Sequence, residues 1–133
     1  MTDAVVLDAS AILAFLLEEP GAEAVLTLLE DGNRIALIGS VNLCEVSTKL
    51  VALGGDSSHV SLNTAPLLPY VVDFDAQQAL YAGELARITK PFGLSLGDRA
   101  CLALAASRGA TAWTTDAAWL KLKIGVKVHL LRG

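Results

Sequence analysis

Short apolar runs rich in β-branched residues alternate along this chain with longer segments whose apolar positions have helical spacing. Residues 4–7 form the first such run, which ends at Asp8, and residues 10–17 are apolar at helical spacing. The same pattern predicts further strands at residues 35–38, 70–72, 111–114 and 128–130. It predicts further helices at residues 20–29, 40–53, 57–68, 76–88 and 96–107. Strands that alternate with helices indicate an α/β fold with a parallel sheet covered on both faces.

Residues that begin and end helices mark the boundaries of these elements. Ser40, Asp75 and Ser95 each precede a helical pattern and are expected to cap it, and Pro20 is expected at the start of the second helix. Gly109 lies just beyond the helix predicted at 96–107 and is expected to end it, while residues 90–93 are expected to form a loop.

The chain has 133 residues, which predicts a single domain over residues 1–133. Hydrophobic residues make up 53% of it, an excess that we attribute in part to an interface with another protein. The longest apolar stretch, residues 4–17, is interrupted by Asp8 and Ser10 and is shorter than the roughly 20 residues that cross a bilayer. The first residues also lack the basic region of a signal peptide, so we expect a cytoplasmic protein without a membrane partner.

The cysteine and histidine residues do not form a metal-binding or redox motif. Cys44 and Cys101 are far apart, each within a helical pattern, and we expect both to be buried. His59 and His129 are also isolated in the sequence, which argues against a zinc site.

Four acidic residues stand out because each interrupts or follows an apolar segment. Asp8 and Asp116 follow predicted strands, whereas Glu45 and Asp98 lie near the beginning of predicted helices. In parallel sheets, sites form in the crevice at the carboxyl ends of the strands. We therefore expect the four carboxylates to converge there and to bind a divalent metal ion.

Each aspartate also has a purely structural interpretation. Asp8 and Asp116 are suited to cap the helical segments that follow them, although Ser10 is an alternative cap for the first. Asp98 lies three residues after Ser95, which is the spacing of a capping box. Glu45 is surrounded in sequence by apolar residues and is expected to require a counter-charge.

The net charge of −4 is numerically that of the four acids, because the other 10 acidic residues balance 10 Lys and Arg. A neutral remainder is compatible with a basic patch for nucleic acid.

Four segments in this order resemble the signature blocks of PIN-domain ribonucleases, and in particular of VapC toxins from toxin-antitoxin pairs. They are the segments around the four acids: VLDASAILA at residues 6–14, NLCEV at 42–46, LSLGDRACLALA at 94–105 and TTDAAW at 114–119. The resemblance extends over the whole chain, and the LDAS and LGDRA motifs are its most specific parts.

The resemblance implies a three-layer α/β/α PIN-like sandwich with a central parallel sheet of four or five short strands. It also implies an endoribonuclease dependent on Mg²⁺, which Mn²⁺ can replace, with Asp8 and Asp98 as direct ligands. Glu45 and Asp116 are then expected to bind through water or to position a second ion. All-carboxylate coordination suits these hard cations. The hydroxyl groups of Ser10, Thr114 and Thr115 are expected to support the ligands.

RNA is the substrate that the resemblance implies, and Arg99 is the first candidate for a phosphate contact, followed by Arg87, Lys90 and Lys49. A homodimer and a cognate VapB-type antitoxin are the implied partners. Seven apolar residues are candidates either for the antitoxin groove or for the core, with core packing favoured: Ala11, Leu13, Phe15, Leu16, Leu43, Val46 and Leu50.

Two alternatives remain open. A phosphoacceptor α/β domain, either haloacid-dehalogenase-like or receiver-like, also has an aspartate at a strand end. The first of these requires an acid where the chain has Ser10, and neither gives Glu45 and Asp98 a role. A catalytically inactive PIN-like binding module is the second alternative, and the presence of all four acids argues against it.

Overall fold

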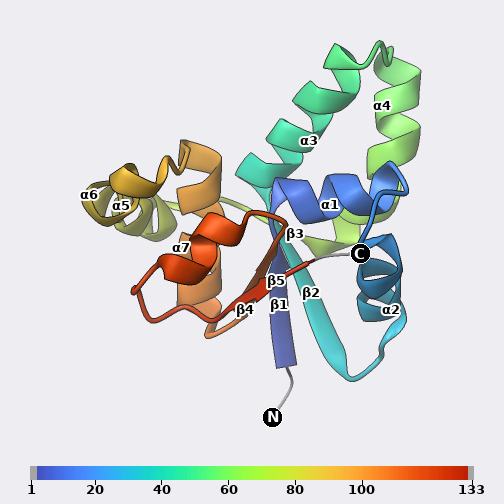
Figure 1. Ribbon diagram of the computed structural model, residues 1–133. Coiled ribbons are helices and arrows are strands. Elements are labelled where there is room, and N and C mark those ends of the chain that lie inside the picture. The colour runs from blue at the N-terminus through green and yellow to red at the C-terminus, as the bar shows by residue number, and fades with distance from the viewer. Residues whose placement is uncertain (1–2, 132–133) are drawn as a thin grey trace.

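Five short strands form one parallel sheet in the computed structural model, which describes residues 3–131 (Figure 1). The strands are β1 (Asp3–Leu7), β2 (Arg34–Gly39), β3 (Val71–Val72), β4 (Thr111–Thr114) and β5 (Val128–Leu130). Their order across the sheet is β3-β2-β1-β4-β5, and every neighbouring pair is parallel. The chain order reverses direction beside β1, where a crevice opens at the carboxyl ends of the strands.

Helices cover both faces of this sheet. They are α1 (Ala9–Leu16), α2 (Ala22–Glu30), α3 (Ser40–Ala52), α4 (Ser57–Thr64), α5 (Ala76–Glu84), α6 (Ala86–Thr89) and α7 (Leu96–Arg108), with the 3₁₀ helices η1 (Ala65–Tyr70), η2 (Lys90–Phe92) and η3 (Ala117–Lys121). Figure 1 shows α1 and α2 on one side of the sheet and α5, α6 and α7 on the other, while α3 and α4 extend beyond the strand ends. The α/β/α sandwich with a parallel sheet that the sequence predicts is confirmed.

Side chains alternate across the central strand and build one hydrophobic core on each face. Val5 and Leu7 pack with residues of α1, α2 and α3, whereas Val6 between them packs with residues of α7 and η3. All three are at most 1% exposed, so β1 is buried on both faces. The seven apolar residues considered for an antitoxin groove all belong to the first core or pack against it, which confirms the core-packing interpretation.

Several predicted boundaries are confirmed, and others are wrong for identifiable reasons. Asp75 and Ser95 cap α5 and α7 as expected, and Gly109 ends α7 with a left-handed backbone (φ 59°). Ser40 does not cap α3. It is the first residue of that helix, Gly39 precedes it as the cap without a side-chain bond, and the Ser40 hydroxyl accepts a hydrogen bond from Phe74 N at 3.0 Å.

The remaining differences between the predicted and observed elements are confined to short segments. The helix predicted at residues 76–88 is divided by a turn at Leu85 into α5 and α6, and Tyr70 belongs to η1 rather than to a strand. The segment expected as a loop at 90–93 contains η2. Pro20 precedes α2, which begins at Ala22 after the left-handed Gly21.

Cys101 is buried as predicted, but Cys44 is exposed, because its face of α3 points away from the core. Within residues 3–131, none of the helices combines the length and apolar character needed to cross a bilayer.

Candidate active site

The crevice beside β1 receives side chains from four separate elements. Asp8 directly follows β1, and Asp116 lies two residues beyond β4, which is the neighbour of β1 in the sheet. Glu45 lies in the second turn of α3, which leaves β2 without a loop, and Asp98 lies in the first turn of α7. The topology therefore directs all four elements toward the same edge of the sheet.

Asp8 is the most deeply buried of the four carboxylates, with 4% of its surface exposed. Its Oδ1 accepts hydrogen bonds from the Ser10 hydroxyl at 2.7 Å and from Ala11 N at 2.8 Å. Asp8 is thus the cap of α1, and Ser10 donates to Asp8 instead of replacing it. Burial raises the pKa of Asp8 from its ordinary 3.8 to about 6, against the lowering effect of hydrogen bonds from Ser10, Thr114 and Ala11, and the charge of Asp98 adds to the increase.

Glu45 is partly buried, and a side-chain amide holds its carboxyl group. The Asn42 side-chain Nδ2 donates to Glu45 Oε1 at 2.8 Å and to the carbonyl oxygen of Gly97 at 3.0 Å. Both partners are acceptors, which fixes the orientation of the amide. Burial raises the pKa of Glu45, the Asn42 hydrogen bond lowers it, and the charge of Asp98 raises it further.

The Glu45 carboxyl group packs directly against Gly97. A Cβ atom at this position would overlap all three carboxyl atoms of Glu45. Only glycine therefore permits α7 to approach α3 so closely, and this approach brings Glu45 near the first turn that carries Asp98.

Asp98 and Asp116 also bind backbone amides at the beginning of helical segments. Asp98 Oδ2 accepts from Ser95 N at 2.9 Å, while the Ser95 hydroxyl accepts from Asp98 N at 3.2 Å, which completes a capping box. Asp116 is exposed, and its Oδ1 accepts from Ala118 N at 2.9 Å at the start of η3. The structural roles considered for Asp8, Asp98 and Asp116 are therefore all present.

Electrostatic coupling identifies which carboxylates the fold brings together. Asp98 raises the pKa of both Asp8 and Glu45, and all three carboxylates raise the pKa of the buried Cys101 thiol, after the larger effect of burial. Asp8, Glu45 and Asp98 consequently share one region. Asp116 is connected to it through Thr114, whose hydroxyl accepts from Asp116 N at 3.1 Å and also forms a hydrogen bond with Asp8.

The donor types in this region suit a hard divalent cation. Glu45, Asp98 and Asp116 each have one oxygen in a hydrogen bond, and their second oxygen has no hydrogen-bond partner within residues 3–131. Oxygen ligands of this kind are those that Mg²⁺ and Mn²⁺ prefer. In the described part of the chain, the side chains as they stand do not form a ready group of three or more His, Cys, Asp or Glu around one point.

The three hydroxyl residues occupy different positions relative to Asp8. Ser10 and Thr114 bind it directly, as described above. Thr115 is exposed, and it is its backbone amide that reaches the site, by donating to the Ser10 hydroxyl at 3.0 Å.

Arg99 lies beside Asp98 in sequence but is directed toward a neighbouring helix. Its Nη1 donates to the carbonyl oxygen of Ala82 on α5 at 2.9 Å. Arg87, Lys90 and Lys49 are exposed.

Sequence reasoning missed two contributors to this site, Asn42 and Gly97. Both occur in the motifs that surround the acids, but their contact joins positions 55 residues apart.

A second missed signal lies in the distribution of charge along the chain. Residues 1–85 contain 12 acidic and 2 basic residues, a net charge of −10, whereas residues 86–133 contain 2 acidic and 8 basic residues, a net charge of +6.

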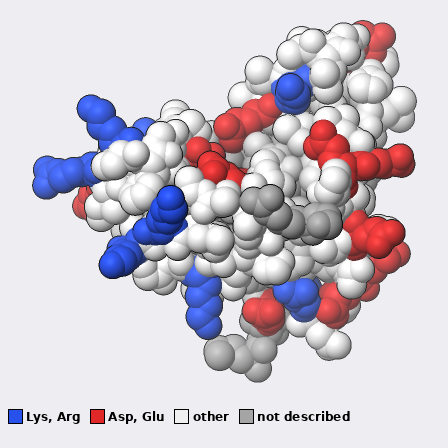
Figure 2. Space-filling model, viewed as in Figure 1, with Lys and Arg blue, Asp and Glu red and all other residues white. Residues whose placement is uncertain are grey.

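The two acids in the basic part are Asp98 and Asp116 themselves. Figure 2 shows most Lys and Arg side chains over the side of the molecule that holds α5, α6 and η3, and most Asp and Glu side chains over the side of α1 and α2. The candidate site thus lies where the two regions of opposite charge meet.

Comparisons with known proteins agree with the geometry. A family model of the PIN domain matches residues 5–124, and no curated protein sequence matches the chain. VapBC2 from Rickettsia felis, solved with a promoter DNA fragment, is similar with a TM-score of 0.72 and 19% identity, over 95% of this chain and 97% of that chain.

Two further structures have the same arrangement. VapC20 from Mycobacterium tuberculosis, described as a toxin that cleaves the sarcin-ricin loop, has a TM-score of 0.69 and 16% identity, over 92% of this chain and 98% of that chain. VapBC from Salmonella typhimurium, bound to DNA, has a TM-score of 0.64 and 22% identity, over 97% and 98% respectively. At these identities the structural likeness shows a shared fold.

Proposed function

We propose that this chain, which belongs to the PIN-domain family, is a Mg²⁺-dependent endoribonuclease and the toxin of a VapBC-type toxin-antitoxin pair. The observation that carries the proposal is the packing of the Glu45 carboxyl group against Gly97, next to Asp98, at the edge of the sheet where Asp8 follows β1. The charge of Asp98 also raises the pKa of Asp8 and of Glu45, and such a site favours a bound cation.

Asp8 and Asp98 are the proposed direct ligands, with Glu45 and Asp116 at the periphery. A bound divalent ion supplies a water of lowered pKa and stabilises negative charge on the leaving oxygen. Asn42 holds Glu45 at a fixed position on Gly97, and Ser10 fixes the orientation of the Asp8 carboxylate. The protein groups therefore bind and orient, while burial excludes bulk water from Asp8.

The charge distribution supports a polyanionic substrate. Four carboxylates repel RNA, but α6 and η2, which precede Asp98 in the chain, and η3, which follows Asp116, contain the exposed basic residues Arg87, Lys90 and Lys121. These residues are suited to contact phosphates and to position the strand. Arg99 remains a candidate for this role through the donors that it does not direct to Ala82.

A cognate VapB-type antitoxin and a homodimer complete the proposal, and the toxin is expected to act on RNA in the cytoplasm. Support comes from the fold shared with structures described as VapBC, as a toxin-antitoxin complex, or as a member of the VapBC family of toxin-antitoxin systems. Exposed apolar residues near the site, such as Leu96 at 56% and Val51 at 60% exposure, provide surface for such partners.

The test is an RNA cleavage assay on purified protein with Mg²⁺, with EDTA, and with the variants Asp8→Asn and Asp98→Asn. We expect cleavage that requires Mg²⁺ and falls at least 100-fold in each variant, because each substitution removes a charged ligand. Glu30→Gln, an exposed acid at the end of α2, is the matched control and should retain full activity. Cleavage that persists in EDTA, or full activity in both active-site variants, would contradict the metal mechanism.

Expression in cells tests the toxin role separately. Wild-type protein without its antitoxin should arrest growth, and Asp98→Asn should relieve the arrest. If expression of wild-type protein that cleaves RNA in vitro did not arrest growth, the toxin proposal would be contradicted and the nuclease proposal would stand.

A further inference from the structure

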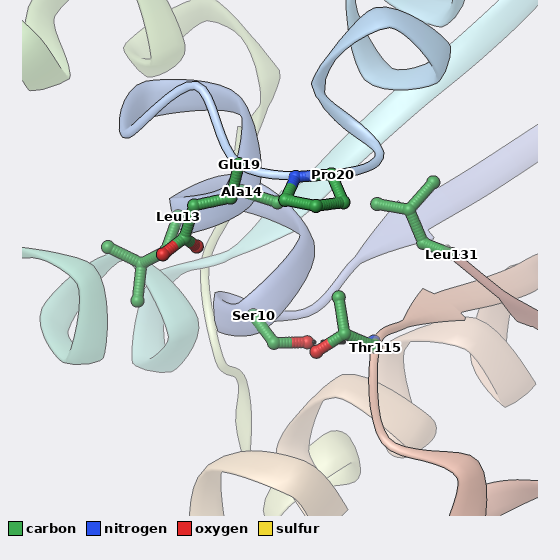
Figure 3. A pocket seen from close by; sticks show the side chains of 7 residues that line it. All are labelled: Ser10, Leu13, Ala14, Glu19, Pro20, Thr115 and Leu131. Atoms are coloured by element: carbon green, nitrogen blue, oxygen red, sulfur yellow. Dashed lines mark hydrogen bonds between the residues drawn. The ribbon is translucent and has the colours of Figure 1, made fainter. Parts of the chain in front are cut away.

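A cavity of about 390 Å³ opens beside the candidate active site (Figure 3). It lies between α1, the turn that follows α1, and the residues directly after β4 and β5. It is lined by Ser10, Leu13, Ala14, Glu19, Pro20, Thr115 and Leu131. Figure 3 shows Leu13, Ala14 and Glu19 on one side of it, Leu131 on the other, and Ser10 and Thr115 below them.

The cavity is one hydrogen bond away from Asp8. Thr115 N donates to the Ser10 hydroxyl at 3.0 Å, and that hydroxyl donates to Asp8 Oδ1 at 2.7 Å. A group that occupies the cavity therefore lies next to whatever is bound at the Asp8 carboxylate.

Glu18 and Gly21, which flank the segment that carries Glu19, both have a left-handed backbone conformation. Glu18 has a φ of 54°, the one positive φ among the non-glycine residues at 3–131, and the turn that it makes lets Glu19 N donate to Ala14 O at 2.8 Å. Gly21 has a φ of 101°, and a Cβ atom there would lie 2.7 Å from Leu131 Cγ. A left-handed glutamate is strained, and strain of this kind is retained where it positions a functional group.

The lining specifies the chemistry of an occupant. Leu13, Pro20 and Leu131 offer apolar walls, which suit the faces of a flat ring, while Glu19 offers a carboxylate that accepts hydrogen bonds from its edge. An anionic group is disfavoured by Glu19 and by the neighbouring Asp8. A nucleobase has apolar faces, polar edges and no charge, and single-stranded RNA presents its bases in this way.

Among the bases, guanine matches a carboxylate best. Its N1–H and exocyclic N2–H₂ are adjacent donors, so that both oxygens of one carboxylate can accept from them. Adenine and cytosine offer one exocyclic amine, and uracil offers one donor between two carbonyl oxygens that repel a carboxylate.

We propose that this cavity is the base-specificity pocket of the enzyme, which holds a nucleobase beside the scissile phosphate and selects guanine through Glu19. The proposal rests on the proposed function for its place in the reaction. An arginine side chain from a protein partner shares the donor geometry, but its guanidinium group fills less of a cavity of about 390 Å³ than a purine ring does.

The test is nucleoside binding to the metal-free protein, followed by NMR through the backbone amides of Ala14 and Thr115. Uncharged nucleosides avoid repulsion between phosphate and the site carboxylates. We expect guanosine to bind at least tenfold more tightly than uridine, and Glu19→Gln to weaken guanosine binding roughly tenfold. Glu30→Gln is the matched control, because it removes the charge of an exposed acid at the end of α2 that does not line the cavity, and it should leave binding unchanged.

Equal affinity for guanosine and uridine, absence of binding, or tighter binding of N-acetylarginine amide would overturn the pocket. The outcomes are separable from those of the proposed function. RNA cleavage without guanosine selectivity would contradict the base-specificity pocket and leave the nuclease proposal standing. Guanosine selectivity without RNA cleavage would support the pocket and contradict the nuclease proposal. In the active enzyme, sequencing of fragment ends from a random RNA pool should show guanosine enriched next to the cut by wild type and less so by Glu19→Gln.

Discussion

Asp8 illustrates how a single residue serves two requirements that oppose each other. Its carboxylate caps α1 and is almost fully buried, and burial raises its pKa to about 6. The native protein therefore holds the Asp8 proton more tightly than the unfolded chain does. The stability linked to this proton is fully present below about pH 4 and is lost as the pH rises to about 6, after which it is constant. The difference between 3.8 and about 6 corresponds to about 3 kcal/mol.

Replacement of Asp8 by Asn should therefore stabilise the metal-free protein at neutral pH. Asn keeps an oxygen for Ala11 N and carries no charge to desolvate. In EDTA at pH 7, we expect the free energy of unfolding of Asp8→Asn to exceed that of wild type by about 3 kcal/mol, and the gap to close near pH 4. Urea unfolding at both pH values checks this, with Glu30→Gln as control. A gap that does not change with pH would show that the Asp8 charge is not the cause.

At the scale of elements, the close approach of α3 and α7 determines where Glu45 lies. Asn42 joins the two helices, and the missing side chain of Gly97 leaves the space that the Glu45 carboxyl group fills. Core packing alone does not produce this contact, because Val46 and Leu50 face the other side, toward the core that includes α1. The contact between α3 and α7 is therefore a part of the site rather than of the core.

Gly97→Ala should displace Glu45 and weaken metal binding. Supporting contacts of this kind change metal affinity by roughly 10- to 100-fold, and we expect the dissociation constant for Mn²⁺, measured by electron paramagnetic resonance, to increase by that factor. Gly83→Ala in α5 is the matched control, because a Cβ atom there meets no neighbour within 4 Å. That control should bind Mn²⁺ as wild type does and gain about 1 kcal/mol of stability, since alanine favours the helix. Equal Mn²⁺ affinity in both variants would refute the positioning role.

The elements also show what the sequence reveals and what it hides. Hydrophobic periodicity and local caps such as Asp75 and Ser95 depend on neighbours within a few residues, so the strands and most helix limits could be predicted. The Ser40 hydroxyl and the Asn42 amide are used by residues 34 and 55 positions away, which no local pattern encodes. The same limit applies to Glu45, whose contact with Gly97 of α7 no local pattern encodes.

For the molecule as a whole, charge is divided between two regions that meet at the site. The net charge of −10 for residues 1–85 and of +6 for residues 86–133 gives the protein a basic side despite its overall −4. The expectation that the acidity of the chain is that of the site alone was too simple, because ten other acids lie in the acidic region and two of the four site acids lie in the basic one. Such a field attracts RNA to one side of the crevice.

Removal of this basic side should weaken RNA binding without regard to sequence. We expect the triple variant Arg87→Ala, Lys90→Ala and Lys121→Ala to lower affinity for single-stranded RNA and to reduce the dependence of log K on log salt by about 0.7 per lost phosphate contact. Arg108→Ala is the control for each of the three single variants, because it also removes one positive charge, at the end of α7 beside Asp3 and Ala4 at the opposite edge of the sheet. Fluorescence anisotropy at several salt concentrations measures both quantities. A loss of affinity in Arg108→Ala equal to that in each single variant would mean that total charge, and not its location, governs binding.

The use of Asp8 and Asp116 as helix caps, and of Asp98 in a capping box, has a consequence for how such a site changes over evolutionary time. Folding alone favours Asp, Asn or Ser at the two caps and an acid or amide at position 98, so a descendant that no longer needs catalysis is still under selection to keep all three polar. Glu45 caps no helix, and its burial raises its pKa, so the fold gains less from its charge than from those of the other three acids. Among the four acids, Glu45 is therefore the one whose loss should first mark a lineage that has given up cleavage.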